Sequence, residues 1–404
     1  MTILFGHPTG NPNSHHAALA HLESGRLESL CVPWMPTRAV LNVLEHLPGV
    51  GGMARRLARR HFAPLADAPK IQGRLPEIRR LLTRAAGAGD EGLSYEANDW
   101  LMDTMRRECR RTAVTAVHAY EDCSLLQFEE AHRLGKACIY DMPIGYYPAW
   151  EQTQATLARS YVDWLPSGGL PSRLHVRPQQ KLAEMKLADL VLAPSTFVSR
   201  TVLDHHPNKT VRLAPYGVDL EAWSPGDFQA ERKDEITFLF AGQISLRKGI
   251  PMLLEAWEAA GLRNARLALV GKWQLSSEKL AGLPRHVSWT PPCSAEALLQ
   301  HYRASDVFVF PSYFEGFGLV LLEAMASGMP AIASTATAGP DVIVPDCGLQ
   351  VPVGDLDALV ASLRWFDQHR ERIPEMGRAA RRQAALCTWR NYRRCVSEAV
   401  APYV

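Results

Sequence analysis

The sequence lacks any long uninterrupted apolar run. No segment of roughly 18 residues is apolar enough to cross a bilayer as a helix. The first residues, Met1–Gly6, carry no positively charged stretch followed by a long apolar one, so they do not predict a signal peptide. We therefore expect a soluble, cytoplasmic protein.

Cysteine and histidine are present but lack the spacing of a metal site. The 8 cysteines include no C-x-x-C pair, and the 14 histidines include no H-E-x-x-H. A D-x-D element is also missing where a metal-bridged diphosphate would need it, because Asp355-Leu356-Asp357 lies beyond the motifs described below. We expect no disulfide framework, no metal ion and no other cofactor.

Charge of one sign is not in large excess. The formal net charge of +2 argues against the strongly basic surface of a nucleic-acid-binding protein, so we expect no nucleic-acid partner. Basic side chains nevertheless gather locally, at Arg55, Arg56, Arg59, Arg60, Lys70, Arg74, Arg79, Arg80 and Arg84. Two interpretations of this basic segment, residues 55–84, stay open. It is a solvated helix face, or it attracts an anionic acceptor or the acidic surface of the inner membrane.

Short apolar runs alternate with helical patterns along all 404 residues, which predicts βαβ units and parallel sheets. The predicted strands are Ile3–Phe5, Val114–Val117, Ala137–Tyr140 and Leu190–Leu192, then Ile236–Phe240, Arg266–Val270, Val307–Phe310 and Pro330–Ala333. We predict an α/β fold with two Rossmann-like domains. Residues 1–208 form the first, residues 209–385 the second, and residues 386–404 a helix that returns to the first.

The most informative segment runs from Val307 to Pro330. It reads as a buried strand, a glycine-bearing loop and a helix that ends near Gly328. Gly316 and Gly318 let the backbone approach a ligand at the helix start, where exposed N–H groups and the helix dipole suit a phosphate. Glu315 and Glu323 are better placed against hydroxyls, which carboxylates bind as acceptors. These residues alone leave open a plain βαβ crossover with glutamates on a solvated face.

The spacing of Glu315 and Glu323 matches the E-x7-E element of retaining glycosyltransferases, and the surrounding sequence resembles glycosyltransferase family 4. Three collinear elements extend this resemblance. They are Phe240–Gly249 (the F-x-G-R-x4-K-G segment), Pro215–Asp219 (P-x-G-V-D), and Asp189 with Pro194 and Ser195 (AD-x-x-x-x-PS). The resemblance covers residues 180–395 well and the first 180 only in outline.

The resemblance implies a GT-B fold, in which two Rossmann-like domains face a central cleft, and a donor site in the second domain. It implies that Lys248 binds the donor diphosphate close to Gly242. Gln243 stands where the family usually has arginine, and either Arg247 replaces that cation or Arg247 is an ordinary surface residue. It also implies that Glu323 binds the ribose and Glu315 the sugar, with the backbone amides of Gly316, Phe317, Gly318 and Leu319 nearby.

The first domain offers two candidates. Gly10 lies in a loop between the first strand and a helix predicted over residues 17–24, and ligands of open α/β sheets collect at the carboxyl ends of strands. His118 ends a predicted strand and resembles a histidine that in this family lies beside the transferred sugar. A structural role for His118 stays open. With Glu315 and Lys248, it completes the candidate catalytic set.

We therefore expect a retaining hexosyltransferase that uses a nucleoside diphosphate sugar and an acceptor hydroxyl on a glycan, a lipid-linked molecule or a small molecule. Two alternatives stay open: a nucleotide-sugar epimerase or phosphorylase of the same fold, and a non-catalytic sugar-nucleotide-binding protein. The sequence does not name the base, the sugar, the acceptor, the linkage or the oligomeric state.

Overall fold

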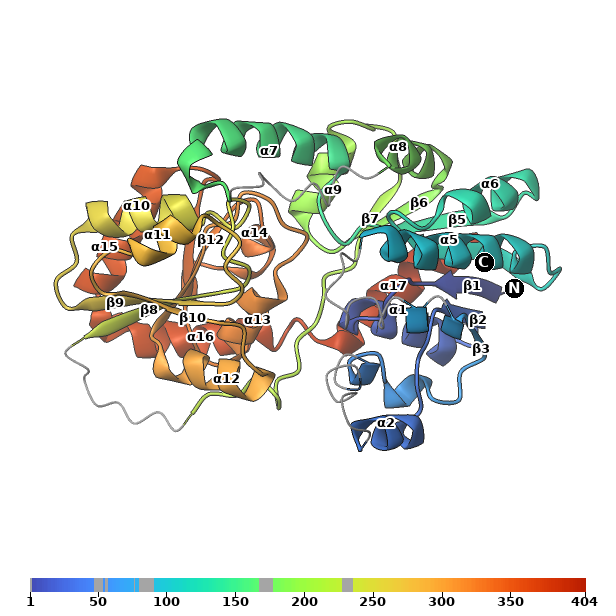
Figure 1. Cartoon of the computed structure of the whole chain (residues 1–404), viewed down its shortest axis with the longest axis horizontal. Helices are drawn as coiled ribbons and strands as arrows, with labels where there is room; N and C mark the ends of the chain where they lie inside the picture. The colour runs from blue at the N-terminus through green and yellow to red at the C-terminus, as the bar shows by residue number, and fades with distance from the viewer. Residues whose placement is uncertain are drawn as a thin grey trace.

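The computed structural model describes residues 2–46, 54, 57–75, 77–79, 91–166, 177–226 and 235–404. They form two α/β units, each built on one parallel sheet, which lie side by side along the long axis of the molecule (Figure 1). The predicted fold class is confirmed. No helix in the described part of the chain has the length and apolar character needed to cross a membrane.

The first unit contains a seven-stranded sheet in the order β3-β2-β1-β4-β5-β6-β7. Its strands are β1 Thr2–Gly6, β2 Leu27–Val32, β3 Lys70–Gln72, β4 Val114–Tyr120, β5 Ala137–Asp141, β6 Leu190–Ala193 and β7 Val211–Leu213. Its helices include α1 Pro12–Glu23, α2 Arg38–Glu45, η1 Ala63–Leu65, α5 Glu91–Glu108, α6 Leu125–Arg133, α7 Tyr147–Ser160, η2 Val162–Trp164, α8 Pro178–Leu187 and α9 Thr196–Leu203.

The second unit contains a six-stranded sheet in the order β10-β9-β8-β11-β12-β13. Its strands are β8 Ile236–Ala241, β9 Ala265–Val270, β10 Val287–Thr290, β11 Val307–Phe310, β12 Ala331–Ser334 and β13 Gly348–Val351. The helices after β8 are α10 Ile250–Ala260, α11 Ser277–Ala281, α12 Ala295–Ala304, α13 Leu319–Ala326, α14 Gly339–Val342, α15 Leu356–Gln368, η3 Arg370–Arg372, α16 Ile373–Ala384, α17 Trp389–Val400 and η4 Ala401–Tyr403.

Strand order changes direction at one point in each sheet. In the second sheet, β8 lies between β9 and β11, so the loops after β8 and β11 leave adjacent strand ends. The carboxyl ends of strands at such a switch point are where open α/β sheets bind ligands. This topology brings the Lys248 loop and the Glu315 loop together.

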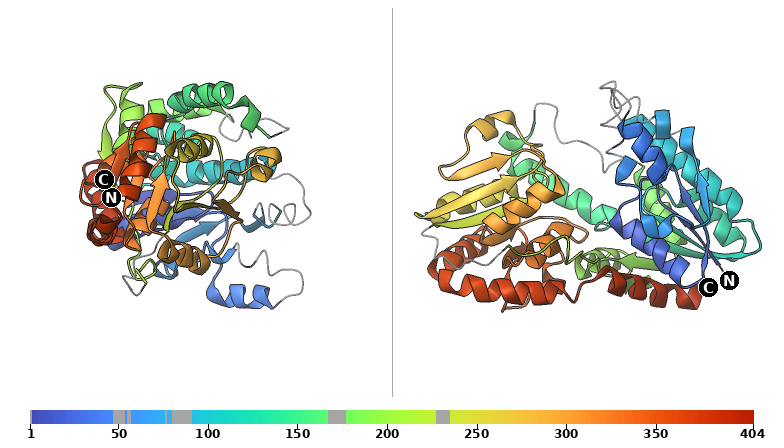
Figure 2. Two further views of the ribbon diagram at one scale, coloured as in Figure 1. Left: turned by 90° about the vertical axis from the view of Figure 1, so that its left-hand side faces the viewer. Right: turned by 90° about the horizontal axis from the view of Figure 1, so that it is seen from below.

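Two parts of the chain define the division between the units. β7 pairs with β6, so the first sheet continues to Leu213, past the expected boundary between residues 208 and 209. The predicted boundary is corrected to lie after β7. The prediction missed this because a strand of three residues has too short a pattern to be assigned to either sheet. The terminal helix α17 lies against α1 of the first unit, where Arg393 Nε is 2.7 Å from Glu23 Oε2. The two chain ends therefore lie close together (Figure 2).

Helix α1 begins earlier than the sequence suggested. The Asn11 side chain caps it by accepting a hydrogen bond from the Ser14 N–H, and the Ser14 hydroxyl accepts one from the Asn11 N–H. Pro12 lies in the first turn. This is a capping box in which serine takes the position usually held by glutamate. The helix therefore starts at Pro12 rather than at residue 17, and it leaves only a short loop around Gly10.

Candidate active site

Lys248 is positioned by the loop that joins β8 to α10. Gly249, just before α10, has φ +74°, and a Cβ there would lie 2.2 Å from the Pro311 carbonyl oxygen in the loop after β11. Only glycine permits this close approach of the two loops. Gly242, at the end of β8, has φ +145°, and a Cβ there would lie 4.0 Å from the Lys248 Cε atom.

Glu315 contacts two cations from that loop. Its Oε1 atom lies against the Lys248 ammonium group and 2.7 Å from a terminal nitrogen of Arg247. Lys248 is 8% exposed and Glu315 7% exposed, so the group is nearly removed from solvent. The Lys248 ammonium group also lies 4.8 Å from the centre of the Phe310 ring, which is a cation–π distance.

Burial and pairing act in opposite directions on these groups. Burial raises the pKa of the Glu315 carboxyl group, but Lys248 and Arg247 outweigh it, and the net pKa is lowered. Burial lowers the pKa of Lys248, Glu315 opposes this, and the net pKa is lowered. The two basic side chains beside Glu315 therefore stabilise its ionised form.

Arg247 also holds the backbone of the Glu315 loop. The same terminal nitrogen donates to the Phe314 carbonyl oxygen at 2.7 Å, and the Arg247 carbonyl accepts from the Tyr313 backbone at 2.8 Å. The side chain is 20% exposed. An ordinary surface role for Arg247 does not fit these contacts. Its role in binding the donor stays a prediction.

Helix α13 starts directly after Gly318, which has φ +87°. A Cβ at Gly318 would lie 2.4 Å from the Phe310 ring. Phe317 is buried and contacts the Tyr216 ring at a centroid distance of 5.5 Å. The Leu321 N–H already donates to the Gly318 carbonyl oxygen at 2.8 Å, which leaves the amides of Leu319 and Val320 as the helix-start donors that could attract an anion.

Gly316 is also a contact between the two units. A Cβ there would lie 1.7 Å from the Pro143 carbonyl oxygen, so the first unit packs directly on the Gly316 backbone. The sequence does not reveal this contact between distant segments. The role of the Gly316 amide in binding the donor stays a prediction.

Glu323 lies on α13, where the Tyr302 hydroxyl of α12 donates to its Oε2 atom at 3.2 Å. Burial raises the pKa of Glu323 to about 7, against the opposing effect of this bond. Tyr302 was not identified from the sequence, because its position on another helix carries no motif. Ligand hydroxyls that donate to Glu323 would favour its ionised form.

His118 lies in the interior of the first unit. It is fully buried, its Nδ1 is 2.8 Å from His21 Nε2, and its Nε2 is 3.5 Å from Asp141 Oδ2. Burial lowers the pKa of His118 to about 3. Contact with a transferred sugar is not available to a side chain without exposed surface. The structural alternative fits this environment, and the catalytic expectation is corrected.

Gly10 closes a tight turn around His7, a residue that the sequence analysis missed. The backbone N–H groups of Thr9 and Gly10 donate to His7 Nδ1 at 3.1 and 2.8 Å. Gly10 has φ +78°, and a Cβ there would lie 2.9 Å from His15 Nε2. Burial, with smaller effects of His15 and Arg60, lowers the pKa of His7 to about 3. His7 thus presents a neutral ring at the carboxyl end of β1.

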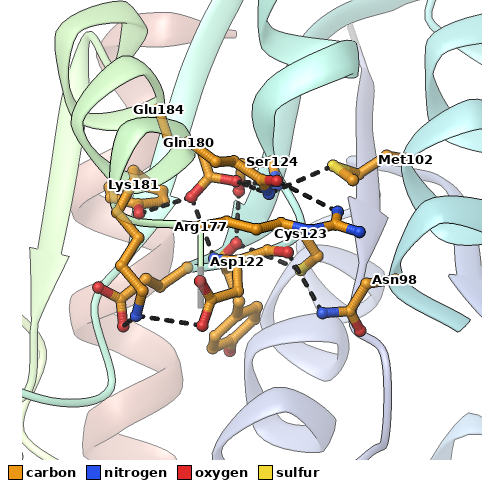
Figure 3. Close-up of polar contacts among 12 residues, drawn as sticks. Asn98, Met102, Asp122, Cys123, Ser124, Arg177, Gln180, Lys181 and Glu184 are labelled. Carbon is orange, nitrogen blue, oxygen red and sulfur yellow. Dashed lines mark hydrogen bonds and ion pairs between the residues drawn. The ribbon is translucent and has the colours of Figure 1, made fainter. Parts of the chain in front are cut away.

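The turn after β4 is held by a buried polar cluster (Figure 3). Glu184 of α8 accepts from the backbone N–H groups of Asp122 at 3.0 Å and Ser124 at 2.8 Å. Lys181 lies 3.2 Å from Glu121 and 3.1 Å from Asp122. Asp122 has φ +70°, a conformation that these bonds stabilise. The cluster fixes the turn at the carboxyl end of β4.

The basic segment 55–84 is only partly described, since Arg55, Arg56, Arg80 and Arg84 lie outside the described residues. Arg60 is buried and pairs with Glu77 at 3.0 Å, while Arg59 and Arg74 are exposed. Contact with a membrane or acceptor stays a prediction. Among the residues that the structure describes, no group of three His, Cys, Asp or Glu side chains is arranged to hold a metal ion.

The family match to known proteins lies in the second unit. Residues 227–383 match the family described as glycosyl transferases group 1. The D-inositol 3-phosphate glycosyltransferase of Geodermatophilus obscurus is 34% identical over 254 residues, which cover 56% of this chain and 54% of that protein. The sulfoquinovosyl transferase SQD2 of Arabidopsis thaliana is 31% identical over 222 residues, which cover 51% and 43%. The chain thus spans about half the length of the curated relatives it matches.

Solved structures resemble the chain over nearly its whole length. Sucrose-phosphate synthase from Thermosynechococcus elongatus has a TM-score of 0.65 at 20% identity, covering 97% of this chain and 96% of that one. HepE from Anabaena, solved with UDP and glucose, has a TM-score of 0.62 at 14% identity, covering 100% of both chains. At these identities the likeness concerns the fold. The chain therefore has the GT-B fold, and its second unit is similar to the glycosyl transferases of group 1.

Proposed function

We propose that this chain is a retaining glycosyltransferase of the family 4 type, which moves a hexose from a nucleoside diphosphate sugar to an acceptor hydroxyl. One observation carries the proposal: the buried Glu315 carboxylate contacts Lys248 and Arg247 beside the start of α13. Cations and helix-start amides suit a diphosphate, and carboxylates suit sugar hydroxyls. HepE, which shares the fold, has been solved with UDP-glucose, and this supports the donor class.

Each residue then has a stated role. Lys248 binds the diphosphate, and the amides at the start of α13 bind the phosphate next to the sugar. Glu315 accepts hydrogen bonds from the sugar hydroxyls, and Glu323 accepts them from the ribose. The acceptor binds from the first unit, near the carboxyl ends of β1 and β4.

The transfer step needs no covalent enzyme intermediate. The bond between the anomeric carbon and the diphosphate oxygen breaks, and its electron pair leaves with the diphosphate. The acceptor oxygen forms the new bond on the same face of the sugar, and its proton passes to the leaving phosphate oxygen. Lys248 and the α13 amides stabilise the growing negative charge, so catalysis is electrostatic and positional. The proposal uses no metal ion and no other cofactor.

The test is to incubate the protein with UDP-glucose, GDP-mannose, ADP-glucose and dTDP-glucose, each with and without a mixture of sugar and polyol acceptors. We expect one donor to release its nucleoside diphosphate, and NMR of the product to show the anomeric configuration of the donor. Epimerisation of the donor sugar without release would indicate an epimerase. Formation of a sugar 1-phosphate from a glycan and inorganic phosphate, with no nucleoside diphosphate released, would indicate a phosphorylase. Binding without any turnover would indicate a non-catalytic protein, and each of these three results contradicts the proposal.

A further inference from the structure

Phe314, the residue before Glu315, is buried in a pocket made by the first unit. Its side chain is 1% exposed. The Trp150 ring of α7 lies 5.3 Å from it and the Phe197 ring of α9 lies 5.2 Å from it, between centroids. Gly145 completes the pocket, because a Cβ there would lie 2.5 Å from the Phe314 ring. We call Gly145, Trp150 and Phe197 the aromatic socket.

Backbone contacts hold the same loop to the first unit. The Gly145 N–H donates to the Glu315 carbonyl oxygen at 3.3 Å, and the Ser195 hydroxyl donates to the Gly316 carbonyl oxygen at 2.5 Å. With Gly316 packed on the Pro143 carbonyl, three consecutive residues around Glu315 are in contact with the first unit. α7 itself runs across the second unit before the chain returns to α8 (Figures 1 and 2).

The second unit also contacts Phe314 and Glu315, through Arg247. Arg247 donates to the Phe314 carbonyl oxygen and pairs with the Glu315 carboxylate. Glu315 is thus fixed through its backbone by the first unit and through its side chain by Lys248 and Arg247. Lys248 and Glu323, in contrast, have no contact with the socket among those that the structure describes.

We propose that the aromatic socket positions Glu315 for the donor sugar, so that the first unit controls the sugar-binding carboxylate of the second. This inference rests on the proposed function. Phe314 is a positioning residue, because it acts through Glu315. If the socket is disturbed, Glu315 shifts while Lys248 and Glu323 remain in place. A misplacement of about 1 Å in a catalytic group is enough to cost about 100-fold in rate.

The test uses the donor of the four above that is turned over fastest, together with its free nucleoside diphosphate. Gly145→Ala places a methyl group against the Phe314 ring. Gly282→Ala is the matched control, because a Cβ at Gly282 would meet only the Glu278 carbonyl oxygen, at 3.5 Å. Phe314→Leu is the second variant, since it keeps an apolar side chain and removes the ring. The melting temperature of each variant is recorded.

We expect kcat of Gly145→Ala and of Phe314→Leu to fall about 100-fold, with the Kd for the free diphosphate within about twofold of wild type. Gly282→Ala should match wild type. In the Phe314→Leu background, Gly145→Ala should add much less loss than it does in wild type, because the Phe314 ring is absent and only the Phe197 ring, 3.1 Å from the added Cβ, remains. Unchanged kcat in both variants, or equal losses in kcat and diphosphate affinity, would overturn the inference. If wild type turns over none of the donors, the proposed function fails, and the inference fails with it.

Discussion

Lys248 and Glu315 are in direct contact, although one follows β8 and the other follows β11. The contact exists because β8 and β11 are neighbours in the sheet and both loops leave its carboxyl edge. Each residue is nearly buried, so each charge depends on the other for stabilisation. A bound diphosphate would place a second anion beside Lys248. The ion pair between Lys248 and Glu315 would then weaken.

The first prediction concerns Lys248→Ala. If Lys248 binds the diphosphate, the variant should lose about 1.5–3 kcal/mol of binding free energy for the nucleoside diphosphate, the range for a hydrogen bond to a charged group. Isothermal titration calorimetry measures this loss. Arg263→Ala removes an exposed cation from the same unit and serves as the control, with no expected change. An unchanged Kd for Lys248→Ala would remove Lys248 from the donor site.

The second prediction concerns the pH dependence of nucleotide binding. The raised pKa of Glu323, about 7, means that its carboxyl group is largely protonated in the free protein below that pH. If ribose hydroxyls bind the ionised form, affinity should increase as pH rises through 7 and fall by up to about tenfold per pH unit below it. The Glu323→Gln variant should lack this change of affinity with pH. Comparing the two proteins at each pH removes the titration of the nucleotide itself. Parallel profiles for both proteins would contradict the assignment.

The third prediction concerns His118 and stability. The lowered pKa of His118, about 3, means that between pH 6.5 and 3 the unfolded chain binds a proton that the folded chain does not. Stability from this residue is therefore lost as pH falls, by up to about 1.4 kcal/mol per pH unit. The melting temperature of His118→Asn should drop less between pH 7 and pH 5 than that of wild type. His46→Asn, at an exposed histidine, is the control. A profile for His118→Asn as steep as that of wild type would contradict this account.

The eight strands predicted from apolar runs all occur, with ends that differ by a few residues. Such runs are easy to read because a strand buried on both faces is apolar throughout. Five strands are not among these eight: β2, β3, β7, β10 and β13. Leu27–Val32 contains Glu28 and Ser29, and Val287–Thr290 is half-exposed. The other three, Lys70–Gln72, Val211–Leu213 and Gly348–Val351, are only three or four residues long. These segments form strands because they pair with neighbouring strands, and their own residue patterns do not indicate it.

Site residues that belong to a sequence motif were easier to predict from the sequence than contacts between the two units. Glu315 and Lys248 were assigned from the resemblance of their motifs to glycosyltransferase family 4, and the structure brings the two side chains together. The contact of Gly316 could not be predicted, because Pro143 lies far away in the sequence. His118 was expected beside the transferred sugar because it resembles a histidine of that family, but His21 and Asp141 enclose it. His7 carried no motif at all.

The fourth prediction separates the two glutamates, and it tests the donor site most directly. Kd for the free nucleoside diphosphate and kcat with the full donor are measured for wild type, Glu323→Ala and Glu315→Ala. Glu323→Ala should weaken the free diphosphate and the full donor alike, since both contain ribose. Glu315→Ala should leave the diphosphate Kd within about twofold and lower kcat by about 100-fold, because its contacts position the sugar in the transition state. A Glu315→Ala protein that loses diphosphate affinity and keeps its kcat would contradict the account.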